Sequence, residues 1–457
     1  MSIVINTIKA GSCATLLLVS GCDLIKDIPV GIGYAAKNIC SSYFLSELDY
    51  DTLTKEHVAP QIAPLGALWK IHVDEDKQTV QVNDIIFGNA NTYTAYYREG
   101  FGCTLLHDST IAKLDQQIPL RYTETESPSE PWPFGKGENP IIAGVDYAQL
   151  DDAVDNAFIQ LEDPANTLAV AVIYKGNLIA EQYADGVDED TRLIGWSMTK
   201  SFTATMIGKL ADDGLLNITG SAPVPEWQGT NKEAITIEHL LHMASGLEWS
   251  ETAQGDTPDQ GNILFLNEDF AKYYIEKPLL DEPGTVHNYS TGSSALLSRI
   301  VQDQVGGTLA DTYRFVNEEI LHPINIYEGV LEFDTVGQPS GGANLYLSAR
   351  DWAKLGQLYL NGGDWYGNQV LSQDWVDYAL TPSIAKPTYG AQLWVNNNQE
   401  SWPYLPESTF AFTGFHKQIV LVIPEHDLII VRLGVTLRGT DFDLSGLSEG
   451  VIASLPE

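Results

Sequence analysis

The sequence predicts a mixed α/β (α+β) protein, with an antiparallel sheet flanked by helices, a helical subdomain and a mostly-β extension at the N-terminus. Three observations support this fold class. Residues 167–186 and 418–435 both have hairpin patterns, although they lie far apart in the chain. Residues 215–335 between them have mostly helical spacing, and residues 22–121 contain period-two stretches. Strands at both ends of a region, with helices between them, indicate one sheet that distant parts of the chain complete.

The composition limits the classes of protein to consider. The chain has 457 residues, of which 44% are apolar and 10% aromatic, as in ordinary globular proteins. This length exceeds what one hydrophobic core usually serves, so we expect a large domain with an additional unit. The 61 acidic and 25 basic residues give a formal net charge of -36, which repels phosphate backbones and anionic headgroups. We therefore expect no nucleic-acid partner, and the charge disfavours anionic substrates.

The N-terminal segment has the pattern of an export signal. Lys9 precedes the apolar run AGSCATLLLVSGC, which is too short to span a bilayer. The run ends in VSGC, which resembles the lipobox of bacterial lipoproteins. That resemblance implies that residues 1–21 are removed and that Cys22 carries a lipid anchor. The expected location is the bacterial cell envelope, attached to a membrane and facing the periplasm. The alternative is an ordinary secretory signal with an incidental cysteine.

Two of the four cysteines would remain free to pair in the exported chain. Cys13 lies within the signal and Cys22 is the lipidation candidate. Because exported compartments are oxidising, we expect a disulfide between Cys40 and Cys103. Two free buried thiols are the alternative.

The chain divides into an extension, a linker and a main domain. The extension, residues 22–121, contains TVQVNDIIFG and NTYTAYYREGFGCTLL, whose alternation predicts strands separated by Gly and Asn turns. Residues 122–144 are rich in Pro, Gly and Glu and are typical of a linker. The main domain is therefore expected to run from residue 145 to residue 457.

The main domain is predicted to begin with a helix and a hairpin. YAQLDDAVDNAFIQL has helical spacing, and TLAVAVIYKGNLIAEQYADG gives two strands that turn around Gly176. Another helix starts within GWSMTKSF and ends at Gly214. Near the C-terminus, QIVLVIPEHDLIIVRLGV gives a second hairpin that turns at residues 424–427.

The stretch GWSMTKSF combines a serine and a lysine three residues apart at the start of a helix. Such residues share a helix face, so Ser197 and Lys200 lie close enough to exchange a proton. A lysine buried among apolar neighbours such as Trp196 has a lowered pKa and can take the serine proton. The helix N-terminus also offers backbone N–H groups to the group that the serine attacks. The alternative is structural, with Ser197 as a helix cap and Lys200 in a solvated first turn.

Three other motif matches fail on their context. Ser383 and Lys386 repeat the serine–lysine spacing, but prolines on both sides disfavour a helical turn. Ser448 lies in GLSEG, a match to G-x-S-x-G, yet no histidine follows it as that fold requires. Glu238, His239 and His242 have the order E-H-x-x-H. No third metal ligand is evident beside the two histidines, so a helix face is the better explanation. We therefore expect no metal site and no cofactor.

Several motifs occur in the order of one known family. GWSMTKSF, IEHLLHMASGL, EPGTVHNYSTGSSALLSRI, LSARDWAKLGQLYLNGG, YGAQLW and FTGFHKQIVLVIPEHDLIIVRLG together resemble the serine β-lactamase superfamily. Within it, the chain is most similar to the class C-related esterases of family VIII type and to 6-aminohexanoate-dimer hydrolases. The resemblance covers about residues 145–457 and no part of the extension. It implies a β-lactamase/transpeptidase-like fold and an acyl-enzyme mechanism.

The resemblance also implies roles for individual residues. Ser197 corresponds to the acylated nucleophile and Lys200 to its proton acceptor. Tyr289, in VHNYSTG, corresponds to the catalytic tyrosine, although a core tyrosine is the alternative. The backbone N–H groups of Ser197 and Phe415 correspond to the oxyanion hole.

The sequence departs from true class C β-lactamases at two positions. Thr291 stands where the family motif Y-x-N has asparagine, and Phe412 stands where K-T-G has lysine. Both departures weaken a β-lactamase assignment. His416 matches the Gly-x-His pattern of the esterase and aminohexanoate branches, with a surface-strand histidine as the alternative. The predicted pocket residues are Trp196, Thr291, Thr413, Gly414 and His416.

The prediction is a serine hydrolase that cleaves a small-molecule ester or amide, as a carboxylesterase or a 6-aminohexanoate-dimer hydrolase-like amidase does. One alternative is a β-lactamase or a D-Ala-D-Ala-type peptidase acting on cell-wall peptides. The other is a non-catalytic binding module that retains the fold. The serine, lysine and tyrosine argue against the binding module, and Phe412 argues against the peptidase.

Overall fold

The computed structural model describes residues 27–63, 66, 69–85, 91–118, 122, 129–159, 165–252, 258–437 and 439–456. The signal segment 1–21 and Cys22 lie outside these ranges. Among the residues that the structure describes, no helix combines the length and the apolar character needed to cross a membrane.

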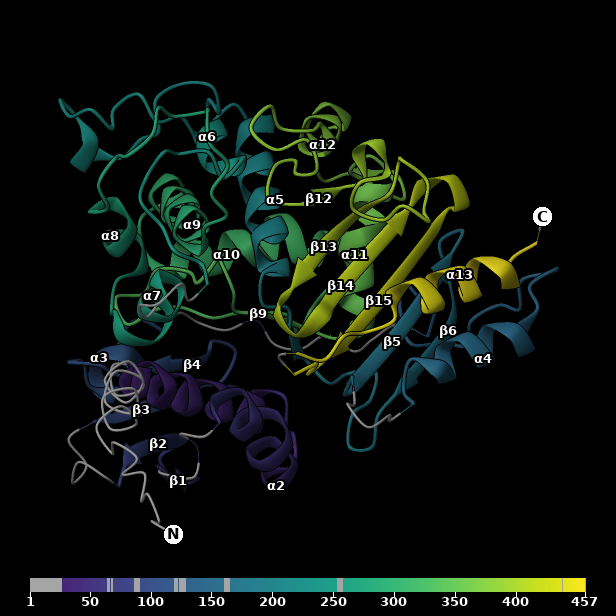
Figure 1. Cartoon of the computed structure of the whole chain (residues 1–457), viewed down its shortest axis with the longest axis horizontal. Helices are drawn as coiled ribbons and strands as arrows, with labels where there is room; N and C mark the ends of the chain where they lie inside the picture. The colour runs from purple at the N-terminus through teal and green to yellow at the C-terminus, as the bar shows by residue number, and fades with distance from the viewer. Residues whose placement is uncertain are drawn as a thin grey trace, which may run out of the picture.

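A six-stranded antiparallel sheet forms the centre of the main domain (Figure 1). Its order is β12-β13-β14-β15-β5-β6, so the hairpin near the start of the domain pairs with the hairpin near its end. Within the pairing of β15 with β5, Ile430 lies opposite Val172. This sheet confirms the prediction that distant parts of the chain complete one sheet. The strands are β5 (Thr167–Tyr174), β6 (Asn177–Tyr183), β12 (Trp394–Val395), β13 (Phe410–Gly414), β14 (Gln418–Ile423) and β15 (Leu428–Gly434).

Helices cover both faces of this sheet because alternate strand residues are apolar on both sides. On one face, α4 (Tyr147–Asn156) and α13 (Leu444–Ser454) lie side by side and cover Val170, Val172 and Leu421 (Figure 1). The helices on the other face bury Val420 and Val422 in the large core. These helices are α5 (Met198–Asp212) and α11 (Ala349–Leu360).

The helical region inserted between the hairpins packs around α5 and α9. It lies beside the sheet rather than over it (Figure 1). Its helices are α6 (Ile237–Leu241), α7 (Asp259–Leu266), α8 (Phe270–Ile275), α9 (Thr291–Val305) and α10 (Leu309–Phe315), and α12 (Gln373–Leu380) follows α11. There are two smaller sheets. One has three strands in the order β7 (Leu193–Ile194), β9 (Leu345–Leu347), β8 (Val330–Leu331), and the other pairs β10 (Asp364–Trp365) with β11 (Asn368–Gln369).

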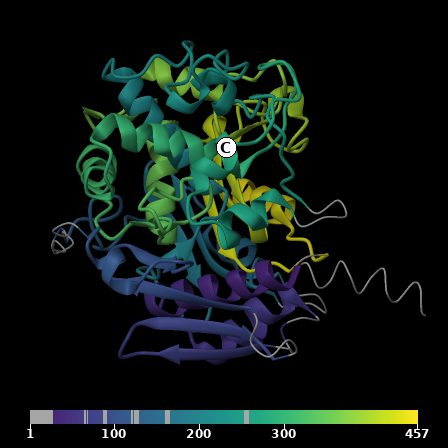
Figure 2. The same ribbon diagram turned by 90° about the vertical axis from the view of Figure 1, so that its left-hand side faces the viewer.

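The N-terminal extension packs against one end of the molecule in both views (Figures 1 and 2). It contains the predicted strands, but it begins with two helical segments, residues 27–45 and 50–62, instead of β structure. The described residues include α2 (Tyr50–Thr52) and α3 (Ile111–Asp115). The four-stranded antiparallel sheet contains β1 (Trp69–Asp74), β2 (Thr79–Asp84), β3 (Thr92–Arg98) and β4 (Gly102–Leu105).

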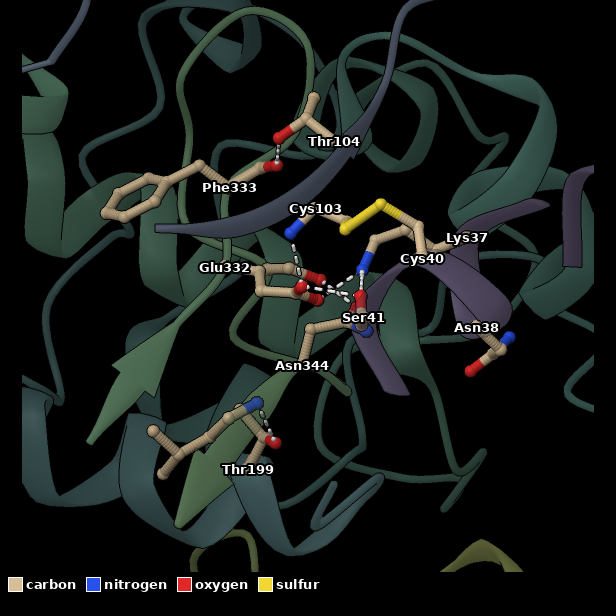
Figure 3. Close-up of polar contacts among 12 residues, drawn as sticks. Lys37, Asn38, Cys40, Ser41, Cys103, Thr104, Thr199, Glu332, Phe333 and Asn344 are labelled. Carbon is tan, nitrogen blue, oxygen red and sulfur yellow. Dashed lines mark hydrogen bonds and ion pairs between the residues drawn. A yellow bond between two sulfur atoms is a disulfide. The ribbon is translucent and has the colours of Figure 1, made fainter. Parts of the chain in front are cut away.

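A buried carboxylate joins the extension to the main domain (Figure 3). Glu332, which follows β8, is fully buried and forms an ion pair with Lys37. The Ser41 hydroxyl donates to it at 2.7 Å, and the backbone N–H of Cys103 donates to it at 2.7 Å. Cys40 and Cys103 form a disulfide beside this cluster, in agreement with the sequence expectation. The helical segment and β4 are thus tied to each other and to the same carboxylate.

The described part of the predicted linker is packed against the main domain. Trp132 is buried, and its indole N–H donates to the carbonyl of Arg350 at 3.2 Å. The Pro- and Gly-rich composition of the segment does not predict this contact. One aromatic residue, Trp132, makes it.

Candidate active site

The candidate nucleophile Ser197 immediately precedes α5 and does not act as a helix cap. Its side chain makes no capping hydrogen bond, which disfavours the structural interpretation of the serine. The preceding residue, Trp196, has φ of +47°, a left-handed conformation that costs a non-glycine residue about 1 to 3 kcal/mol. Such strain is maintained only when the surroundings enforce it, and it concentrates at functional sites.

The amine of Lys200 is buried and lies beside Ser197. The Lys200 side chain is among the largest fully buried ones, and its Nζ lies 3.0 Å from Ser197 Oγ. The same Nζ donates to the carbonyl of Gly342 at 2.7 Å and to Thr291 Oγ1 at 3.1 Å. Burial lowers the pKa of the Lys200 amine from 10.5 to about 8, against the opposing effect of the Glu251 charge. The amine is therefore neutral in about a tenth of the molecules at pH 7.

Thr291, at the first position of α9, connects Lys200 to an acidic residue. Its hydroxyl donates to Glu251 Oε1 at 2.6 Å, and its backbone N–H donates to Glu251 Oε2 at 2.9 Å. The indole N–H of Trp249 donates to the same Oε2 at 2.6 Å. Three donors thus hold the Glu251 carboxylate near the buried lysine.

Tyr289 lies next to both Ser197 and Lys200. Lys200 Nζ is 5.1 Å from the centroid of the Tyr289 ring. Burial raises the pKa of the Tyr289 phenol above its ordinary value of 10.0, the Glu251 charge acts in the same direction, and a hydrogen bond with Ser197 opposes them. Tyr389 packs edge-on against the Tyr289 ring with centroids 5.9 Å apart. Trp394 stacks on the same ring with centroids 6.0 Å apart. The phenol is therefore protonated and held in place by aromatic neighbours.

The end of β13 approaches the nucleophile closely. A Cβ on Gly414 would lie 2.2 Å from the carbonyl oxygen of Gly195, so only glycine permits this approach. The Phe415 ring packs edge-on against Trp196 with centroids 5.6 Å apart. This packing brings the backbone of residues 414–415 to the start of α5, where the sequence predicts the oxyanion hole. That role remains a prediction.

A buried arginine supports the turn that follows β13. Arg432 is fully buried, and its guanidinium donates to the carbonyl oxygens of His416 at 2.8 Å and Lys417 at 3.2 Å. Both of these residues have left-handed backbone conformations, with φ of 65° and 62°. The guanidinium therefore holds a strained turn beside the candidate oxyanion hole.

The five predicted pocket residues fall into three groups. Thr413 and Gly414 line an open hollow of about 820 Å³, together with Trp402, Tyr404 and Phe442. Thr291 contacts Lys200 and Glu251, as described above. Trp196 and His416 instead line a cavity of about 40 Å³ between the main domain and the extension.

The extension contacts these last two residues directly. Tyr34 stacks on Trp196 with ring centroids 6.3 Å apart, and Gln61 Nε2 lies 3.2 Å from His416 Nδ1. His416 is buried, which disfavours the interpretation of a surface-strand histidine. The extension thus covers the turn that carries the strained residue before Ser197.

The rejected motifs have structural roles. Ser383 lies in a loop, where its hydroxyl accepts from the N–H of Ala385 at 3.3 Å. Ser448 is buried within α13, and its hydroxyl donates to the carbonyl of Leu444 at 2.8 Å. His239 belongs to the capping box at the start of α6. Within the described ranges, no group of three or more His, Cys, Asp or Glu residues is arranged to hold a metal ion.

Sequence reasoning missed three contributors to the site. Glu251 lies in a loop without periodicity, 40 residues before its partner Thr291. Arg432 is the single charged residue in an apolar strand. A charge at a buried position usually has a specific partner, and this was the signal that could have identified it. Tyr34 belongs to the extension, which carries no chemical motif.

The chain is similar in sequence and in fold to known proteins. The Beta-lactamase family model matches residues 154–443. The 6-aminohexanoate-dimer hydrolase of Paenarthrobacter ureafaciens is 23% identical over 369 residues, covering 75% of this chain and 88% of that protein. The solved structure of a family VIII carboxylesterase superposes with a TM-score of 0.54 at 16% identity, covering 70% of this chain and 100% of that one. A class C beta-lactamase gives a TM-score of 0.53 at 16% identity, covering 70% and 99%.

Proposed function

Because the chain belongs to the beta-lactamase family and is a serine hydrolase acting on ester or amide bonds, we propose that its reaction passes through an acyl-enzyme formed on Ser197. The observation that carries this proposal is the contact between the buried Lys200 amine and the Ser197 hydroxyl, 3.0 Å apart. A serine hydroxyl is a weak nucleophile unless an adjacent base takes its proton.

Lys200 is the proposed base in the acylation step. With a pKa of about 8 instead of 10.5, its neutral fraction at pH 7 is roughly 300-fold larger than that of an exposed lysine. As the Ser197 Oγ attacks the substrate carbonyl carbon, its proton moves to Lys200 Nζ. The backbone N–H groups of Ser197 and Phe415 then stabilise the negative oxygen of the tetrahedral intermediate.

Tyr289 is the proposed acid for the leaving group. A phenol with a raised pKa is protonated when the substrate binds, so it donates a proton instead of taking one. The proton that Lys200 has received then returns to the Tyr289 phenolate oxygen, and the short path for this transfer is set by the Lys200 amine, which lies 5.1 Å from the centroid of the Tyr289 ring. Collapse of the intermediate expels the alcohol or amine and leaves Ser197 acylated. Water then attacks the acyl-enzyme, with the Lys200 and Tyr289 pair removing its proton.

The proposed substrates are small, uncharged or cationic esters and amides. A formal net charge of -36 and the Glu251 carboxylate beside Lys200 oppose an anionic group near the nucleophile. Phe412 is buried against Tyr359, with ring centroids 5.3 Å apart, so its position supplies no cation for a substrate carboxylate. The similarity to a 6-aminohexanoate-dimer hydrolase supports an amide as the bond that is cleaved. A cell-wall peptidase is the second candidate, and Phe412 disfavours it.

Covalent labelling tests the proposed nucleophile. We expect a fluorophosphonate to add one adduct to the purified protein and the Ser197→Ala variant to add none, with loss of p-nitrophenyl ester and short amide turnover in the same variant. Ser383→Ala and Ser448→Ala are matched controls that should retain both. Retained activity in Ser197→Ala would refute the assignment, and a stable penicillin adduct would favour the peptidase.

We also propose that the protein is a lipoprotein of the cell envelope. The lipobox-like VSGC at residues 19–22 supports this, and so does the disulfide, which suits an oxidising compartment. Labelling cells that express the chain with a radioactive fatty acid tests it. Label should enter the parent and not the Cys22→Ala variant, whereas equal labelling of both would refute the anchor.

A further inference from the structure

The Glu251 carboxylate is held in one orientation by three hydrogen bonds. Its Oε2 accepts from the Trp249 indole at 2.6 Å and from the Thr291 backbone N–H at 2.9 Å. Its Oε1 accepts from the Thr291 hydroxyl at 2.6 Å. Because a carboxylate only accepts, the proton of the Thr291 hydroxyl must point toward Glu251.

The direction of this hydroxyl determines how Lys200 is bonded. With its proton committed to Glu251, Thr291 Oγ1 can only accept from Lys200 Nζ, which lies 3.1 Å away. The carbonyl of Gly342, at 2.7 Å, can also only accept. A neutral amine has two N–H bonds and one lone pair, so both N–H bonds are used by these acceptors. The lone pair is left for Ser197 Oγ at 3.0 Å.

We infer that Glu251 is a positioning residue, which orients the Thr291 hydroxyl so that the lone pair of Lys200 faces the Ser197 hydroxyl. The inference rests on the proposed function, because it matters only if Lys200 is the base. It also explains why threonine is tolerated where the related motif has asparagine. An amide has separate donor and acceptor atoms, but a hydroxyl can do either, so it needs a fixed acceptor to define its direction.

Replacing Glu251 with glutamine reverses this pattern. In the variant, the amide oxygen takes the place of Oε2 and accepts from the Trp249 indole and the Thr291 backbone N–H. The amide NH₂ group then takes the place of Oε1 and faces Thr291 Oγ1. That NH₂ group donates, so the Thr291 hydroxyl must send its proton elsewhere, and the Lys200 lone pair is the nearby acceptor. The lone pair is then no longer free for Ser197. We expect kcat for a p-nitrophenyl ester to fall about a hundredfold with KM nearly unchanged, as for loss of general-base catalysis.

A second substitution should restore activity. Thr291→Val removes the hydroxyl that blocks the lone pair, so the Glu251→Gln/Thr291→Val double variant should be more active than Glu251→Gln alone. We expect kcat of the double variant to return to the level of Thr291→Val. If Glu251 had a purely structural role, the effects of the two substitutions would add, and kcat of the double variant would be lower than that of Glu251→Gln alone. A double variant that is no more active than Glu251→Gln would overturn the inference.

Two controls separate the possible failures. Glu248→Gln changes an exposed glutamate on the same loop and should leave kcat unchanged. Ser197→Ala, assayed beside the other variants, should abolish turnover. Loss of activity in Ser197→Ala without restoration in the double variant refutes the inference alone, whereas retained activity in Ser197→Ala refutes the proposed function.

Discussion

Replacing Glu332 with glutamine should destabilise the protein in a manner that depends on pH. Glu332 accepts hydrogen bonds from Lys37, Ser41 and the backbone of Cys103, and it is fully buried. A glutamine oxygen can still accept from Ser41 and Cys103, and its NH₂ group then faces Lys37. The ammonium loses its counterion and keeps its burial, which already lowers the pKa of Lys37 in the parent.

The magnitude follows from the protonation of Lys37. In the folded variant, Lys37 is expected to be neutral, because its lone pair can then accept a hydrogen bond from the glutamine NH₂ group. Deprotonating an amine with an ordinary pKa of 10.5 costs about 5 kcal/mol at pH 7 and about 2 kcal/mol at pH 9. The unfolded variant binds one proton more than the folded variant in this range, so its stability rises with pH. The loss of unfolding free energy relative to the parent should therefore shrink as pH rises.

Urea unfolding of the full chain at pH 7, 8 and 9 measures this loss. We expect Glu332→Gln to be least stable relative to the parent at pH 7 and to approach it by at most about 1.4 kcal/mol per pH unit, because burial also lowers the pKa of Lys37 in the parent. The Lys37→Met/Glu332→Gln double variant is the control, because it lacks the titrating amine and should show no such slope. A constant difference between Glu332→Gln and the parent from pH 7 to pH 9 would refute the reasoning.

Three further predictions concern the catalytic tyrosine, the disulfide and the extension. Tyr289→Phe should lower kcat for an amide about a hundredfold or more, and less for a p-nitrophenyl ester, whose leaving group needs no proton; equal losses would contradict its role as the acid. Replacing Cys40 and Cys103 with serine should lower the unfolding free energy by on the order of 4 kcal/mol for a 63-residue separation, and an unchanged urea midpoint would contradict this. Tyr34→Ala should lower kcat severalfold, measured where the variant is fully folded, because Trp196 loses the ring stacked on it; unchanged kcat would show that the extension does not support the site.

Local patterns in the sequence predicted the parts of the fold that local interactions determine. The hairpin at residues 174–177 follows from Gly176, whose φ of +69° suits a tight turn. The contact between Ser197 and Lys200 follows from helical spacing, because residues three apart share a face. The disulfide followed from compartment and cysteine count.

Contacts between distant residues were beyond the sequence patterns. Residues 27–40 are helical although they include Gly31 and Gly33, which disfavour helices. Gly33 is required by packing, because a Cβ there would lie 2.7 Å from the carbonyl oxygen of Phe265. Glu251 likewise gains its role only when the fold brings its loop to Thr291. Tertiary packing decided both features, and neither leaves a local pattern.

The pH dependence of Ser197 acylation tests the central claim most directly. The claim is that a neutral Lys200 amine, buried beside Ser197, activates its hydroxyl. The second-order rate constant for labelling by a fluorophosphonate should rise with pH and reach half its maximum near pH 8, where burial places the pKa of Lys200. Lys200→Met should lose this rise together with most of the rate. A rate constant that is independent of pH between 6 and 10, or a midpoint that persists in Lys200→Met, would contradict the account.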